Sequence, residues 1–322
     1  MNIKKVFICR PIPEIAEEML KKAGIQVEKN PLDKILSPDE LKKKVAGMDA
    51  VLSLLSDKIT AEVLASAGSQ LKIVANYAVG VDNIDIRACQ AQGVMVTNTP
   101  DVLTEAVAEH VLALTLATTR RVVEADRFTR RGEFKQWMPL GFIGPSLFGK
   151  TMGIIGMGRI GSLTGEMAHS GFKMKVIYFD LKRDKEFENK TGAKFASIAK
   201  LLKNADVVSL NVPLTPKTKH LISSQEFKQM KQTATLINTS RGPVVDEKAL
   251  VSALKSKEIW GAGLDVFEEE PKVNPELIKM DNVVLTPHIA SATSEARDAM
   301  AEVAAKNIIA VLGGKKPLNQ VC

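Results

Sequence analysis

Short apolar runs alternate with helical stretches along most of the chain, and this alternation constrains the fold more than any other feature of the sequence. Expected strands in the first hundred residues lie at 5–9, 49–55, 71–77 and 94–98. Expected helices between them lie at 15–24, 37–47 and 85–93. A second series of apolar runs lies at 151–156, 174–180, 206–212, 234–240, 261–266 and 282–287. Such alternation is typical of an α/β fold, in which helices cover parallel sheets.

A stretch of different character separates the two series. From Asp101 to about Arg131 the spacing predicts one long helix, which leads into a loop at 132–150 that is rich in glycine and proline. An amphipathic helix of about Ser294–Leu312 closes the chain. The 322 residues are enough for two domains of ordinary size.

Composition narrows the possible partners. Hydrophobic residues make up 45% of the chain, and the formal net charge is +7. The lysines and arginines are scattered among acidic residues and form no basic stripe with interleaved aromatic side chains. Nucleic-acid binding requires such a stripe, so we expect no nucleic-acid partner. A positive net charge instead favours anionic small molecules as ligands, because it attracts them electrostatically.

Cysteine usage and the chain start favour a cytoplasmic protein. Cys9, Cys89 and Cys322 form no pattern typical of a disulfide framework or a metal site. The apolar run before Arg10 has only four residues, too few for a signal-peptide core. No stretch approaches the roughly eighteen apolar residues of a membrane span, so we expect no membrane partner.

A glycine-rich turn between a strand and a helix predicts a dinucleotide site. Gly156 permits a tight turn, Gly158 lets the backbone approach a pyrophosphate, and Gly161 lets helix and strand pack closely. Asp180 ends the next strand, nineteen residues after Gly161, where an acid binds the adenosine ribose hydroxyls. Its carboxylate would repel a 2′-phosphate, which favours NAD over NADP. The following Lys182 and Arg183 act against this preference, because they could pair with a phosphate.

Four polar residues follow predicted strands in the second half of the chain: Arg241, Asp265, Glu270 and His288. Each is unremarkable alone, as a surface arginine, as acids of a solvated loop, or as a structural histidine. Together they are expected at one crevice, because ligands bind at the carboxyl ends of the strands in a doubly wound sheet. Pro287 stiffens the strand exit immediately before His288.

Six stretches carry a family resemblance: ANYAVGVDNID, VTNTPDVLTEAVAEH, GIIGMGRIG, LINTSRGPVVDEKAL, GAGLDVFEEEP and NVVLTPHIASAT. Through them the chain resembles the D-isomer-specific 2-hydroxyacid dehydrogenases over almost its whole length, and it looks closest to the glyoxylate/hydroxypyruvate reductases. One departure is Ala290, where glycine is more common, which is harmless unless the backbone there needs a positive φ.

The resemblance implies a fold and a reaction. It implies a Rossmann NAD-binding domain (99–289) inserted in a flavodoxin-like substrate domain (1–98 plus 290–322), both of them doubly wound parallel sheets. It assigns catalysis of 2-oxo acid reduction to Arg241, Glu270 and His288. Arg241 would anchor the substrate carboxylate, His288 would donate the proton, and Glu270 would stabilise its imidazolium form.

The resemblance also assigns contacts. For NAD it implies Thr104, Gly156, Gly158, Arg159, Ile160, Gly161, Asp180, Val212, Pro213, Thr239 and Asp265, with no metal required. For the substrate it implies the amides of Val79 and Gly80, and the loop that carries Leu55 is expected to limit substrate size.

The loop at 132–150 carries Trp137, Phe142 and Phe148 close together in the sequence, which indicates a partner surface. The resemblance implies a homodimer in which Trp137 enters the substrate site of the partner subunit. The alternative is that Trp137 packs against its own domain.

Two other functions stay open. A 3-phosphoglycerate dehydrogenase would use the same chemistry, and substrate profiling would distinguish it. A dinucleotide-sensing corepressor shares the fold and the catalytic positions, but the chain shows no basic or disordered extension for recruiting nuclear partners.

Overall fold

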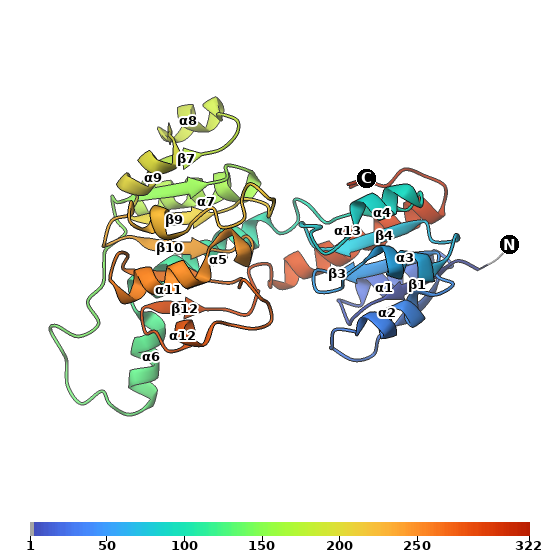
Figure 1. Ribbon diagram of the computed structural model, residues 1–322, viewed down its shortest axis with the longest axis horizontal. Coiled ribbons are helices and arrows are strands. Elements are labelled where there is room, and N and C mark those ends of the chain that lie inside the picture. Colours follow the sequence, from blue (N-terminus) through green and yellow to red (C-terminus); the bar gives the residue numbers. More distant parts are fainter. Residues whose placement is uncertain (1–2) are drawn as a thin grey trace. The chain divides into compact units, whose positions relative to one another are not determined.

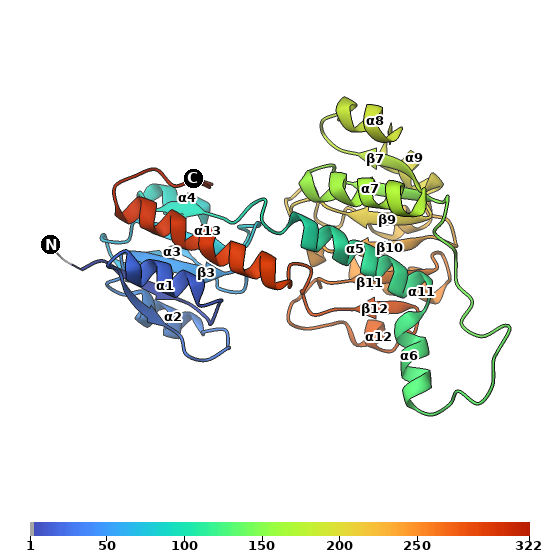
Figure 2. The same ribbon diagram turned by 180° about the vertical axis from the view of Figure 1, so that it is seen from behind.

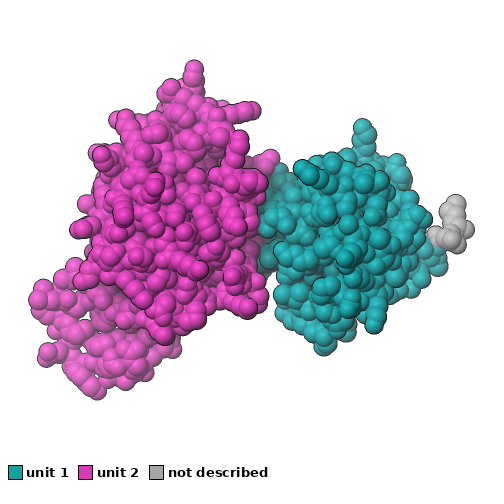
Figure 3. All heavy atoms as spheres, in the orientation of Figure 1, with its two compact units in different colours: residues 1–103, 292–322 teal, residues 104–291 magenta. Residues whose placement is uncertain are grey.

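The computed structural model describes residues 3–322 and divides the chain into two compact units (Figure 3). Unit 1 combines the N-terminal part, up to Leu103, with Ala292–Cys322. Unit 2 is the intervening Thr104–Ser291. The observed boundaries lie a few residues beyond the expected ones, after 98 and after 289.

The core of unit 1 is a five-stranded parallel sheet with the strand order β2-β1-β3-β4-β5. Its strands are β1 (Lys5–Ile8), β2 (Gln26–Lys29), β3 (Ala50–Leu54), β4 (Ile73–Tyr77) and β5 (Met95–Thr97). This order is the flavodoxin-like one, in which the order of strand addition reverses between β1 and β3 and leaves a crevice at their carboxyl ends. The expected fold class is confirmed for this unit.

Helices cover both faces of this sheet. They are α1 (Ile15–Lys22), α2 (Pro38–Val45), α3 (Ala61–Ala67), α4 (Ile86–Ala91) and α13 (Ser294–Leu312). The first and last of these, α1 and α13, pack side by side on one face, as Figure 2 shows. Buried residues of α2, α3 and α4 form a core on the other face. The C-terminal helix therefore completes a unit that begins at the other end of the chain.

Unit 2 has a seven-stranded parallel sheet with the order β12-β11-β10-β9-β6-β7-β8. Its strands are β6 (Thr151–Ile155), β7 (Lys175–Phe179), β8 (Lys194–Phe195), β9 (Val207–Leu210), β10 (Thr235–Asn238), β11 (Gly261–Leu264) and β12 (Val283–Leu285). Taken in chain order, this is the Rossmann arrangement extended by one strand, with its switch point between β6 and β9. The carboxyl ends of these strands carry the residues of interest.

Two hydrophobic cores enclose the sheet of unit 2 (Figures 1 and 2). One lies beneath α5 (Thr104–Thr119), α7 (Arg159–Phe172) and α8 (Lys185–Thr191). The other lies beneath α9 (Ile198–Asn204), α10 (Ser224–Phe227) and α11 (Glu247–Lys255). Short elements, the 3-10 turn at Gly242–Val244 and α12 (Pro275–Ile278), complete the unit.

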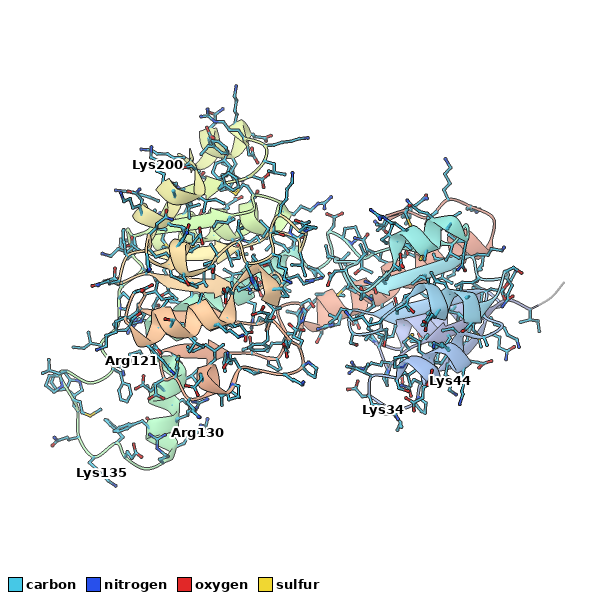
Figure 4. The ribbon with its side chains drawn as sticks, in the orientation of Figure 1. Lys34, Lys44, Arg121, Arg130, Lys135 and Lys200 are labelled. Carbon is cyan, nitrogen blue, oxygen red and sulfur yellow. The ribbon has the colours of Figure 1, made fainter. Side chains whose placement is uncertain are left out.

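The expected helix from Asp101 to Arg131 is wrong, because the structure has two helices there. Helix α5 ends at Thr119, and α6 (Val122–Arg130) follows after Arg121, whose φ of 53° is left-handed. Arg121 bonds Glu124 through both its Nε and Nη2 atoms and so stabilises the break. Figure 1 shows α6 and the loop after it extending away from the sheet, and Figure 4 labels Arg130 and Lys135 on this segment. We call residues 122–148 the arm.

Residues 3–322 contain neither a candidate membrane span nor a candidate metal site. None of the helices is both long enough and apolar enough to cross a membrane. Within the same residues, the histidine, cysteine and acidic side chains form no group that could hold a metal ion.

Candidate active site

The glycine turn between β6 and α7 is shaped by close backbone contacts. Gly156 has a φ of 96°, and a Cβ there would lie 2.5 Å from the carbonyl oxygen of Asn211. A Cβ on Gly161 would lie 2.1 Å from the carbonyl oxygen of Gly156. Both positions therefore exclude any side chain, one for its backbone angle and the other for the approach of helix to strand.

The space above Gly158 is open. A Cβ there would meet nothing within 4 Å, and Gly158, as the N-cap residue of α7, has no side chain to cap the helix. Arg159 and Ile160 are the first residues of that helix. Uncapped amides at a helix N-terminus carry partial positive charge and bind phosphate groups. These residues fit the pyrophosphate of a dinucleotide.

Asp180 lies directly against this turn. It follows β7, and its Oδ2 accepts a hydrogen bond of 2.6 Å from the amide of Met157. Its Oδ1 accepts one of 3.2 Å from the amide of Lys182. The carboxylate is thus fixed beside the phosphate turn, at the position where the ribose of a dinucleotide is expected.

The other residues expected at the cofactor follow neighbouring strands or begin a helix. Val212 and Pro213 come after β9, and a Cβ on Gly156 would lie 2.9 Å from Cγ1 of Val212. Thr239 follows β10 and is half-buried, and Thr104 opens α5.

Glu270 and His288 form the central pair of the candidate active site. Nδ1 of His288 lies 2.9 Å from Oε2 of Glu270. The other carboxylate oxygen, Oε1, accepts a 3.0 Å hydrogen bond from the amide of Phe267. Both side chains are partly exposed. Because the carboxylate is held at both oxygens, it fixes the orientation of the imidazole ring.

Arg241 follows β10 and is brought close to the same segment by a glycine. A Cβ on Gly242 would lie 1.8 Å from the carbonyl oxygen of Phe267, so only glycine allows these two loops to touch. Nη1 of Arg241 donates a hydrogen bond of 2.8 Å to the carbonyl oxygen of Ser240. Asn238 holds the turn by donating to the Arg241 carbonyl at 2.9 Å. The arginine loop and the Glu270 loop are therefore in direct backbone contact.

Asp265 is a fully buried carboxylate that organises the loop around His288. Its Oδ1 accepts from the hydroxyl of Thr286 at 2.6 Å and from the amide of Ile289 at 2.8 Å. Its Oδ2 accepts from the amide of Ala290 at 2.8 Å. Burial alone would raise the pKa of Asp265, but hydrogen bonds from His110, Thr286 and the two amides outweigh it and lower this pKa below its ordinary value. The group is therefore a buried anion at neutral pH.

His288 itself has a left-handed backbone, with a φ of 56°. Its amide donates to the carbonyl of Asp265 at 2.8 Å, which holds this uncommon conformation in place. Ala290 is not among the residues of positive φ, so the departure from glycine at that position is harmless. The stiffness expected from Pro287 is therefore only part of what shapes this loop, because hydrogen bonds to Asp265 and the left-handed backbone of His288 also determine it.

Sequence reasoning missed His110, which belongs to the same network. It lies on α5, with Nε2 placed 3.1 Å from Oγ1 of Thr286 and 3.4 Å from Oδ1 of Asp265. Its side chain is largely buried. The available signal was weak: His110 is one of only four histidines, on a helix expected to pack against the sheet.

In unit 1, the residues expected at the substrate lie on two neighbouring loops. Leu55 follows β3, and Val79 and Gly80 follow β4, its partner in the sheet. Two buried asparagines, which the sequence did not reveal, fasten these loops. Asn76 donates to the Gly80 carbonyl at 2.8 Å, and Asn83 donates to the carbonyls of Leu54 and Asp57 at 3.0 Å each.

The aromatic residues of the arm do not form the single cluster expected from the sequence. Phe142 packs against Phe128 of α6, with ring centroids 5.2 Å apart. Phe148 is exposed, and Trp137 is 79% exposed. The alternative in which Trp137 packs against its own domain is therefore wrong for this chain.

Comparisons with known proteins agree with these features. Residues 112–290 match the family described as D-isomer specific 2-hydroxyacid dehydrogenase, NAD binding domain. A glyoxylate reductase of Thermococcus litoralis is 52% identical over 322 residues, covering 98% of this chain and 96% of that protein. A protein of Thermus thermophilus with a solved crystal structure is 42% identical, with a TM-score of 0.92 and coverage of 99% of this chain and 100% of that one.

One more solved structure bears on the cofactor. An NADPH-dependent glyoxylate/hydroxypyruvate reductase from Sinorhizobium meliloti, in complex with NADP and malonate, is 29% identical. It has a TM-score of 0.86 and covers 100% of this chain and 97% of its own. The family model matches unit 2, whereas the relatives cover 98% or more of this chain and so include both units. The chain therefore belongs to the D-isomer specific 2-hydroxyacid dehydrogenase family, as an NAD(P)-linked enzyme.

Proposed function

We propose that this enzyme reduces a small 2-oxo acid, either glyoxylate to the achiral glycolate or hydroxypyruvate to the D-2-hydroxy acid D-glycerate, with Arg241, Glu270 and His288 as its catalytic residues. The observation that carries the proposal is the 2.9 Å contact between Nδ1 of His288 and Oε2 of Glu270. The similarity to glyoxylate reductases supports the substrate class. Hydroxypyruvate is included because a hydroxymethyl group adds little volume to glyoxylate.

The Glu270–His288 pair accounts for proton transfer. Glu270 accepts from Nδ1–H and stabilises the imidazolium form, which leaves the Nε2 proton available for the substrate oxygen. Among the described residues, no hydrogen bond occupies Nε2. In the reverse direction, neutral His288 accepts the proton of the hydroxyl group.

Arg241 binds the substrate and polarises it. A planar guanidinium can bridge the carboxylate and the 2-oxo oxygen of one substrate, as a lysine cannot. When bound, the nicotinamide supplies the hydride that reduces the carbonyl carbon. The amides of Val79 and Gly80 would bind the carboxylate further, while Leu55 would limit the size of the substrate side chain.

We further propose NADH as the preferred cofactor, bound by the residues expected from the sequence. The support is the position of Asp180, whose carboxylate is fixed against the Met157 amide. A 2′-phosphate would meet a like charge there, which costs several kcal/mol when the charges are close. The family resemblance assigns Asp265 to the NAD contacts. Asp265 would contribute by holding the loop of His288 in place through its hydrogen bonds.

A homodimer formed through the arm is part of the proposal. The arm exposes large apolar side chains: Phe134, Trp137, Leu140, Ile143 and Phe148. A hollow of about 490 Å³ beside it is lined by residues that include Leu116, Phe142 and Phe172. Exposed apolar side chains next to an apolar hollow are typical of a partner surface. Trp137 would then narrow the substrate site of the partner subunit.

A panel of 2-oxo acids tests the function. We expect kcat/KM for NADH oxidation to be highest with glyoxylate and hydroxypyruvate and to fall as the substrate side chain grows. Hydroxypyruvate should give D-glycerate, which chiral chromatography identifies. A preference for bulky 2-oxo acids, or an L-product, would contradict the proposal.

A further inference from the structure

The guanidinium of Arg183 is engaged by a carboxylate of its own chain. Its Nε lies 2.7 Å from Oε1 of Glu188, and its Nη2 lies 2.6 Å from Oε2. This is the two-pronged geometry in which arginine also binds phosphate groups. Arg183 comes three residues after Asp180, in the loop where the 2′-phosphate of NADPH would arrive.

Glu188, on α8, is itself anchored. Its Oε1 accepts a 2.9 Å hydrogen bond from the hydroxyl of Tyr178, a fully buried residue of β7. The same hydroxyl accepts from the amide of Asp184 at 2.7 Å. The Glu188 side chain is only 13% exposed, whereas that of Arg183 is 56% exposed. The hydrogen bond from Arg183 is the largest of the effects that lower the pKa of Glu188, so the anchored group is an anion at neutral pH.

The net charge near Asp180 depends on the ion pair between Glu188 and Arg183. The loop carries two carboxylates, Asp180 and Asp184, and two cations, Lys182 and Arg183. Asp184 is engaged as the cap of α8, where its Oδ1 accepts a 2.9 Å hydrogen bond from the amide of Phe187. If both cations were available, they would offset the repulsion between Asp180 and a 2′-phosphate. Glu188 neutralises one of them and occupies two of its donors.

We propose that Glu188 is a specificity-determining residue, which favours NADH by holding Arg183 away from the 2′-phosphate position. The inference rests on the proposed cofactor preference and extends it to a residue outside the glycine turn. Discrimination against NADPH then has two parts, the charge of Asp180 and the capture of Arg183.

The test is Glu188→Gln, which keeps the side-chain size and an acceptor for Tyr178 but removes the charge. The measured quantity is kcat/KM with NADPH divided by kcat/KM with NADH. We expect this ratio to rise about two- to fivefold, the range set by the strength of an exposed ion pair. The matched control is Glu186→Gln, which removes an exposed charge from the same helix and should leave the ratio unchanged.

Arg183→Gln, made in the wild type and in Glu188→Gln, tests whether Glu188 acts through Arg183. In the wild type it should change the ratio little, because Arg183 is already captured. In Glu188→Gln it should abolish the gain. An unchanged ratio in Glu188→Gln, an equal rise in Glu186→Gln, or a gain that survives Arg183→Gln would overturn the inference. A wild type that prefers NADPH would instead refute the proposed cofactor preference. The change in the ratio between wild type and Glu188→Gln would still test the role of Glu188 in that case.

Discussion

Two regions of unit 2 differ in the surroundings of their side chains. One is the loop that carries His288, and the other is the arm. In the loop, the buried Asp265 binds a hydroxyl and two amides of the same chain. In the arm, Trp137 and Leu140 are 79% and 83% exposed. One region is ordered by internal hydrogen bonds, and the other presents apolar surface that has not been removed from water.

The difference bears on which parts of the proposed site one chain can build alone. The proposed proton-transferring pair needs an orientation that tolerates little error, and the buried Asp265 carboxylate holds the loop of His288 through short hydrogen bonds. The arm needs a second surface before its apolar side chains contribute to stability. Mutations in the loop should therefore act on chemistry and stability, and mutations in the arm on association and substrate choice.

The largest effect should come from His288→Ala, which removes the proton donor. We expect kcat for glyoxylate to fall about 10²–10⁴-fold, the usual contribution of general acid catalysis. NADH affinity, measured by fluorescence titration, should change little. His169→Ala removes a histidine of α7 in the same unit and should keep most of the activity. Near-normal turnover in His288→Ala would contradict the assignment.

Asp265→Asn should weaken the loop itself. An amide cannot accept from all the donors around Asp265, so we expect a loss of about 1–3 kcal/mol in the free energy of unfolding at pH 7. The native pKa of Asp265 is lowered, so its charge stabilises the fold above the ordinary carboxyl value of about 4, and this contribution is lost as the pH falls through the native value.

Urea unfolding at pH 7 and below pH 4 measures this dependence. The gap between wild type and Asp265→Asn should narrow in acid. Asp281→Asn, at an exposed position, is the control and should show neither effect. A gap that stays constant with pH would mean that hydrogen bonding lost with the side chain, and not its charge, stabilises the loop.

Trp137→Ala tests the other region. If Trp137 lies in the proposed dimer interface, its removal should cost about 2 kcal/mol of association free energy, seen as a shift to monomer in concentration-dependent light scattering. KM for hydroxypyruvate should rise several-fold and selectivity against bulkier 2-oxo acids should relax. Leu318→Ala, also exposed but in unit 1, should change neither. A monomeric wild type would remove the role of Trp137 in the partner's site.

Glu270→Gln should have the smallest effect of these substitutions, and it tests what the carboxylate contributes to the function of His288. The glutamine oxygen can keep the hydrogen bond from the Phe267 amide, but Nδ1 of His288 then faces a neutral amide in place of a carboxylate, so kcat for reduction should fall. We expect a loss of less than about tenfold, because the pair is partly exposed. Glu269→Gln makes the same charge change next to it, and an equal loss of kcat in both variants would argue against a role of Glu270 in orienting His288.

Features with a local cause were predictable from the sequence. Gly156 and Gly161 are required by contacts within one strand, turn and helix, and the capped helix Ser294–Leu312 has the expected bounds. The edge strands β2 and β8 were missed because neither has a buried residue and both lack an apolar run. The break at Arg121 was missed because the helical spacing continues across it.

Features built by distant residues could not be predicted in this way. Asp265 and His110 meet the His288 loop from 23 and 178 residues away in the sequence, and no spacing rule encodes such contacts. The left-handed backbone of His288 is likewise imposed by its partners and not by its own preference. The family resemblance indicated Arg241, Glu270 and His288 as candidates, and the structure shows which contacts hold Glu270 and His288.

Unit 1 is assembled from two stretches of the chain that are separated by unit 2, and this affects how it can fold during synthesis. Helix α13 lies on one face of the first sheet, against α1 and β4, yet it is synthesised after the whole of unit 2. The N-terminal part of unit 1 therefore leaves the ribosome with that face covered by α1 but not by α13, while the continuous unit 2 has all its strands before α13 exists. Unit 1 closes its core only through contacts between residues far apart in the sequence, which are slow to form. During that interval the partly covered sheet face is open to chaperones and to aggregation.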